Sequence, residues 1–138
     1  MSMCINFHYG FLALITCSVL AGCMPVQLSE RELVGSWRAA TECGIESLEL
    51  KADTTYTQYI DFDGTGGSVS HNGTWAVIPR SSSLSGGKLI LKDALEFCSI
   101  LGKRLPRPER GERQLETVWE WGRVLLSFNP DKQGFERQ

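Results

Sequence analysis

From Gly35 onward the chain consists of short segments in which apolar and polar residues alternate, separated by turn-forming Gly, Asn, Asp and Pro residues. Alternation places every second side chain on one face of a strand, whereas an amphipathic helix needs a period of about 3.6 residues, which no segment after Gly35 has. Short strands at such spacing are typical of an all-β antiparallel meander that forms a barrel or a sandwich. A small barrel of seven to eight strands is expected, because closure removes exposed sheet edges.

Most of the strands can be placed from their alternation and flanking turns. The expected strands are Ser47–Lys51, Thr55–Phe62, Thr74–Ile78, Lys88–Cys98 (as one bent strand or two short ones), Leu115–Trp121, Val124–Phe128 and Phe135–Arg137. His71 to Gly73 is expected to be a turn, and residues 102–111 a basic loop. Before the strands, Ser29 and Glu32 fit a capping box, which predicts a short helical turn.

The N-terminal part of the chain has a different composition. Its mostly apolar run of eleven residues, Phe11–Ala21, is long enough for export but too short to span a bilayer as a stable helix. The sequence Leu20-Ala21-Gly22-Cys23 resembles the lipobox of a bacterial lipoprotein signal peptide. The resemblance implies that residues 1–22, the signal helix, are removed and that Cys23 carries the lipid. The alternative is an uncleaved hydrophobic anchor.

Removal of residues 1–22 leaves 116 of the 138 residues, which suits one domain with a modest core. Residues 23–28 would then be the lipidated N-terminus and linker, and residues 29–138 the barrel domain. The 14 basic and 16 acidic side chains all follow Cys23 and give a net charge of −2. Because nucleic-acid binding needs a clear basic excess, no nucleic-acid partner is expected.

Cleavage and lipidation would also leave only Cys43 and Cys98 free to pair with each other. Two cysteines in an exported domain suggest one disulfide, which would contribute about 4 kcal/mol by closing a loop of about 55 residues. Two free buried thiols are the alternative. No metal or other cofactor is expected, because two thiols and one histidine fall short of four ligands.

The segment Leu33-Val34-Gly35-Ser36-Trp37-Arg38 resembles the opening of lipocalin-like barrels, in which a short 3₁₀ turn leads into a Gly-x-Trp strand. The resemblance extends over most of residues 28–137 and implies that a basic side chain from a late strand packs on Trp37. Arg123 is the first candidate for this partner, and Arg137 is the second. A vaguer similarity links the chain to small envelope inhibitors built on eight-stranded barrels.

Four aromatic residues are candidates to line a ligand cavity, because a large apolar ring with one polar atom suits a binding pocket. They are Tyr56, Trp75, Trp119 and Trp121. Ordinary core packing is the alternative for all of them. No enzymatic activity is expected, because His71 is the sole histidine after cleavage and both remaining cysteines are better explained as a disulfide.

The sequence therefore predicts a non-enzymatic lipoprotein of the cell envelope, attached to a membrane that faces the periplasm or the exterior, and to the outer membrane if the source is Gram-negative. Its lipocalin-like domain is expected to bind a small apolar ligand. The alternative is a protein-interaction module, an inhibitor or assembly accessory, with a filled barrel core and another envelope protein as its partner.

Overall fold

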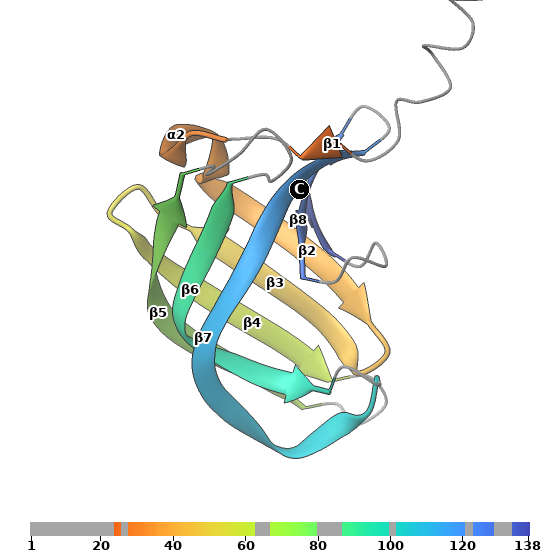
Figure 1. Cartoon of the computed structure of the whole chain (residues 1–138). Helices are drawn as coiled ribbons and strands as arrows, with labels where there is room; N and C mark the ends of the chain where they lie inside the picture. The colour runs from red at the N-terminus through yellow and green to blue at the C-terminus, as the bar shows by residue number, and fades with distance from the viewer. Residues whose placement is uncertain are drawn as a thin grey trace, which may run out of the picture.

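The computed structural model describes residues 24–25, 28–62, 67–79, 87–99, 102–120, 123–128 and 134–138 (Figure 1). The predicted signal helix, Cys23 and Trp121 lie outside these ranges. The elements in chain order are β1 (Met24–Pro25), α2 (Glu30–Leu33), β2 (Gly35–Thr41), β3 (Gly44–Leu50), β4 (Thr55–Phe62), β5 (Ser68–Ile78), β6 (Lys88–Cys98), β7 (Arg104–Glu120), β8 (Arg123–Ser127) and β9 (Gly134–Arg137). Among the described helices, none has the length and apolar character needed to cross a membrane.

The strands close into an antiparallel barrel of eight strands, β2 to β9, which confirms the predicted fold class. Each strand pairs with the next along the chain, and β9 returns to pair with β2 through Trp37 and Arg137. β1 continues the β6 edge of β7 beyond the start of β6, where Met24 and Pro25 pair with Trp119 and Val118 of β7. The start of the described chain is thereby attached to the C-terminal end of β7.

The short helix α2 covers one end of the barrel (Figure 1). The Glu32 carboxylate accepts hydrogen bonds from the backbone N–H of Ser29, at 2.8 Å, and from its hydroxyl, at 2.7 Å. These contacts confirm the predicted capping box. Leu33 is fully buried, so the helix contributes to the core as well as closing the barrel end.

Two segments that the sequence analysis assigned to a turn and a loop belong to strands. His71, Asn72 and Gly73 lie inside β5, where they pair with Gln58, Thr57 and Tyr56 of β4. Much of the predicted basic loop is the first part of β7, which starts at Arg104. Local turn propensity is overruled in both places by pairing with a neighbouring strand: β4 pairs with residues 71–73, and β6 pairs with Arg104 and with residues 109–111.

Prolines also occur in that first part of β7, at Pro106 and Pro108. In the described chain, β7 up to Arg113 pairs with β6 alone, so its other edge has no strand beside it. Proline lacks a backbone N–H and is tolerated at such an edge, where it hinders pairing with other molecules.

The interior contains two clusters of buried apolar side chains. The larger one fills the barrel between α2 and the middle of the strands, and the smaller one includes Ile60, Leu95 and Phe97 near the end of β6. The predicted disulfide between Cys43 and Cys98 is present beside the smaller cluster and joins the β2–β3 turn to the end of β6. The disulfide therefore closes the end of the barrel that is farthest from α2.

Gly73 provides a test of how tightly the barrel is packed. A Cβ at this position would lie 2.5 Å from the Lys92 carbonyl oxygen and 2.6 Å from the Tyr56 ring. We expect Gly73→Ala to lower the free energy of unfolding by about 1–3 kcal/mol, because backbone and a buried ring would have to move. Urea unfolding measures this. The matched control is Gly111→Ala, whose Cβ would meet nothing within 4 Å; equal effects of the two substitutions would contradict the expectation.

Candidate binding site

Two of the four aromatic residues expected to line a ligand cavity lie in the described core. Tyr56 is 0 % exposed and donates a hydrogen bond from its hydroxyl to the Lys92 carbonyl at 3.0 Å. Burial raises the pKa of Tyr56 to about 12, so its hydroxyl stays protonated at neutral pH. Trp75 is 3 % exposed and donates to the carbonyls of Lys51 and Thr55. Their polar atoms are therefore occupied by the backbone of the barrel.

The other two aromatic candidates are Trp119 and Trp121. The backbone of Trp119 lies in β7, paired with Met24 on one side and Val124 on the other, and Trp121 lies outside the described residues. Their place as ligand-lining residues remains a prediction from the sequence.

Dense packing characterises the described interior. A side chain that lined a water-sized cavity would expose surface to it, so an exposure near zero means contact on all sides. Twelve large inward side chains are less than 2 % exposed: Leu33, Trp37, Leu48, Leu50, Tyr56, Gln58, Ile60, Leu89, Leu91, Leu115, Leu126 and Phe135. At these positions, side chains occupy the space that a ligand would need.

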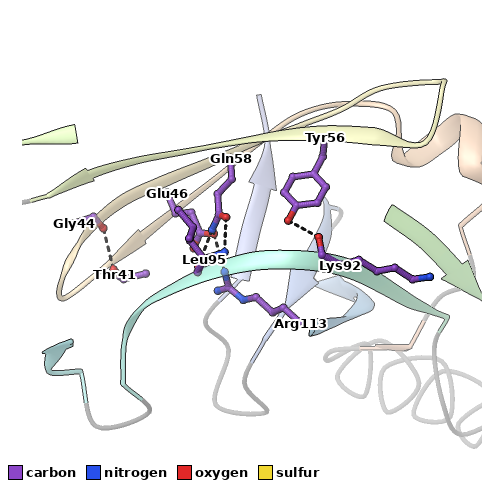
Figure 2. Close-up of polar contacts among 8 residues, drawn as sticks. All are labelled: Thr41, Gly44, Glu46, Tyr56, Gln58, Lys92, Leu95 and Arg113. Carbon is purple, nitrogen blue, oxygen red and sulfur yellow. Dashed lines mark hydrogen bonds and ion pairs between the residues drawn. The ribbon is translucent and has the colours of Figure 1, made fainter. Parts of the chain in front are cut away.

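A polar cluster that the sequence analysis did not predict crosses the interior (Figure 2). Gln58 of β4 donates from its amide nitrogen to the Glu46 carboxylate at 2.6 Å, and Arg113 of β7 donates to the same carboxylate oxygen, Oε1, at 2.7 Å. Both Glu46 and Gln58 are 0 % exposed. Alternation along β3 carried a signal for Glu46, since Glu46 lies on the same face of the strand as the buried residues Leu48 and Leu50.

Gln58 completes the backbone hydrogen bonds at a place where the barrel wall is interrupted. The pairing of β5 with β6 ends at Thr74 and Lys92, and Asp93 follows with a positive φ of 59°. Further along β6, Leu95 donates its N–H to Gln58 Oε1 at 2.9 Å, and its carbonyl accepts from Gln58 Nε2 at 2.9 Å. Because buried backbone groups need partners, one glutamine amide here replaces a neighbouring strand.

The second carboxylate oxygen of Glu46, Oε2, is buried and has no hydrogen-bond partner. Burial raises the pKa of the Glu46 carboxyl above its ordinary value of 4.5, although the charge and hydrogen bond of Arg113 oppose the shift. The Arg113 guanidinium also lies 5.0 Å from the Phe128 ring centre and 5.5 Å from that of Phe135. Arg113 thus connects the polar cluster to the apolar core.

The basic partner of Trp37 is Arg137, and the expectation for Arg123 was wrong. The Arg137 guanidinium lies 5.7 Å from the Trp37 ring centre and donates to the carbonyls of Glu32 and Val34 at the end of α2. Arg123 instead forms an ion pair with Glu136 at 2.8 Å. The reason is register, because Arg137 of β9 pairs directly with Trp37, whereas Arg123 lies one strand further away, on β8.

His71 and the basic segment lie on strands β5 and β7, near Asp93 of β6. His71 Nε2 lies 3.2 Å from Asp93 Oδ2, without the alignment of a hydrogen bond. The basic segment at the start of β7 is interspersed with carboxylates, since Glu109 pairs with Glu96 and Arg110 lies 3.7 Å from Asp93. Within the described ranges, no group of three or more potential metal ligands occurs.

The barrel's outer surface carries a wide groove across β2, β3, β4 and β5. Its volume is about 770 Å³, and its lining includes Tyr59, one of the two exposed large apolar side chains of the described chain. The lining residues are Ser36, Trp37, Arg38, Ile45, Ser47, Tyr59, Ile60, Asp61, Ser68, Val69, Ser70 and Gln138. The sequence contains no local signal for this groove, because the groove requires four strands in their observed register.

Comparison of the chain with protein-family models, with curated proteins and with solved structures gives no match.

The pH dependence of stability tests the environment of Glu46. Between the ordinary pKa of 4.5 and the higher pKa in the fold, the folded chain holds a proton that the unfolded chain has lost, so the free energy of unfolding falls as pH rises. We expect the stability of the native protein relative to Glu46→Gln to decrease as pH rises above 4.5. Urea unfolding at a series of pH values measures this. Glu49→Gln, on the exposed face of the same strand, is the matched control; a relative stability that increased with pH would contradict the expectation.

Arg137 and Arg123 form a second matched pair of variants. Arg137→Ala loses two hydrogen bonds to α2 and the contact with the Trp37 ring, so we expect a loss of about 1–3 kcal/mol in the free energy of unfolding. Arg123→Ala loses a surface ion pair whose side chains are 55 % and 51 % exposed, so we expect a change of at most about 1 kcal/mol. Denaturation followed by Trp fluorescence measures the stability of both variants. A larger effect of Arg123→Ala would contradict the assignment of the Trp37 contact to Arg137.

Proposed function

We propose that the protein is a non-enzymatic lipoprotein of the cell envelope that acts through the outer surface of a filled β-barrel. The domain would hold a partner on its outside and would carry no small apolar molecule within. Of the two functions that the sequence leaves open, this shares the filled barrel core of the second, and it leaves open whether the partner is a protein or a smaller molecule.

The packing of the interior is the observation on which the choice between the two functions rests. A ligand-binding barrel needs a cavity of several hundred Å³ lined by apolar and a few polar groups. Tyr56 and Trp75 are nearly inaccessible, and their polar atoms already bond to the backbone. An eight-stranded barrel is narrow enough for side chains to fill it, so this packing favours binding on the outside.

Two observations support the envelope location. The sequence Leu20-Ala21-Gly22-Cys23 provides an address and an attachment point for lipid. The disulfide between Cys43 and Cys98 suits an oxidising compartment, where such bonds persist. Export of the chain would explain both features together.

The position of β1 supports a close attachment of the barrel to the membrane. Met24 pairs with Trp119 in β7 and is the residue directly after Cys23, so only one peptide unit of about 3.8 Å separates the lipid-bearing residue from the sheet. A lipid on Cys23 would place the β1 end of β7 beside the membrane. The disulfide-bonded end of the barrel, where Cys98 pairs with Arg104 at the other end of β7, would then point away.

Native mass spectrometry of the protein purified from membranes tests the proposal. We expect a chain that begins at Cys23, with the added mass of its acyl chains and no non-covalently bound apolar molecule. Cys23→Ala should move the protein out of the membrane fraction, because several acyl chains are needed for stable anchoring. Cys98→Ala, which leaves the lipidation site intact, is the control. A membrane-bound chain that retains residues 1–22 would refute lipidation, and a stoichiometric apolar ligand would refute the filled-barrel function.

A further inference from the structure

The groove on the outer face of β2 to β5 has the properties of a binding site. Its volume of about 770 Å³ lies within the range of about 300–1,000 Å³ that is usual for small-molecule sites. Strand order places it across the barrel from the proposed attachment, since β3 and β4 form the wall that faces β6 and β7 (Figure 1). A lipid-tethered barrel would therefore keep this groove clear of the β1 side.

Tyr59 is the dominant side chain in the groove, and its neighbours leave its ring uncovered. It is 49 % exposed, although a tyrosine on a sheet is normally covered in part by the side chains directly opposite. Its two cross-strand neighbours are Ser47 on β3 and Ser70 on β5. Both serines are too short to cover the ring, so Tyr59 offers an accessible aromatic face between hydroxyl groups.

Apart from the apolar residues Trp37, Ile45, Ile60 and Val69, the rest of the lining is polar, and its side-chain charges are balanced. Arg38 lies in the same cross-strand row as Tyr59, and Asp61 is next but one along β4, so one cation and one anion border the groove. Ser36, Ser68 and Gln138 add hydroxyl and amide groups. Opposite single charges give no net attraction for an anion or a cation, and they leave donors and acceptors for a neutral, hydrogen-bonding molecule.

We propose that this groove binds a neutral oligosaccharide, with one sugar ring stacked on Tyr59. A sugar has an apolar C–H face that suits an aromatic ring, and hydroxyl groups around its edge that suit serine, arginine and carboxylate side chains. A protein partner would be expected to insert a large anchor into a mainly apolar pocket, whereas seven of the twelve residues that line this groove are polar or charged, and four of them are serines. The inference rests on the proposed function of the outer surface and names its ligand class.

Titration of the membrane-purified protein with neutral trisaccharides tests this inference. The probes are the β-1,4-linked trimer of N-acetylglucosamine, cellotriose and maltotriose, in a detergent without a sugar headgroup, and the readout is isothermal calorimetry. We expect at least one probe to bind. Tyr59→Ala should weaken its affinity about tenfold, because both the stacked ring face and the apolar area that it would bury are lost. Tyr59→Phe should retain affinity within about threefold, because the ring face is kept.

Ile78→Ala is the matched control, because Ile78 lies on β5, the strand beside the one that carries Tyr59, is similarly exposed at 48 %, and lies outside the groove lining. It should leave binding unchanged. The proposal is overturned if no probe binds, or if Tyr59→Ala and Ile78→Ala have equal effects. It is also overturned if a photo-crosslinker at residue 59 joins the groove to a protein that trisaccharides do not displace. The mass-spectrometric test of lipidation and of the empty interior is independent, so either proposal can fail alone.

Discussion

Eight strands closed into a ring enclose a space that inward side chains either fill or leave open. In this barrel the inward side chains fill the space, and the rest of the structure depends on that packing. Large residues at inward positions, such as Tyr56, Trp75 and Phe135, occupy the interior. The polar atoms of Tyr56 and Trp75 donate hydrogen bonds to backbone carbonyls. Dense packing removes the space for a guest, and it makes the barrel rigid. Under the function proposed above, recognition would therefore involve the outer surface.

One part of the interior is polar, and it resolves a problem created by the backbone. β6 separates from β5 after Lys92, which would leave the buried N–H and C=O of Leu95 without partners. Gln58 forms hydrogen bonds with both groups. The second N–H of its amide donates to Glu46, which also pairs with Arg113. A buried carboxylate is costly unless paired, so the cluster stabilises the barrel only as a unit.

The two sides of the barrel are suited to different tasks. β1 fixes the start of the described chain to β7, directly after the cysteine expected to carry lipid. The groove around Tyr59 lies across the ring on β2 to β5, where short serines leave an aromatic face accessible. Attachment and binding would thus involve opposite walls of one small, closed domain.

The alternation of apolar residues determined the fold class, the bounds of β4 and β6, and the inward faces of Tyr56 and Trp75, because these depend on local periodicity. Cysteine count determined the disulfide. Only the tertiary structure decided that residues 71–73 continue a strand, that Arg137 rather than Arg123 meets Trp37, and that the interior is packed. These features depend on which strand lies beside which, and in what register. Alternation along a single strand says which face a side chain takes but does not say what lies opposite.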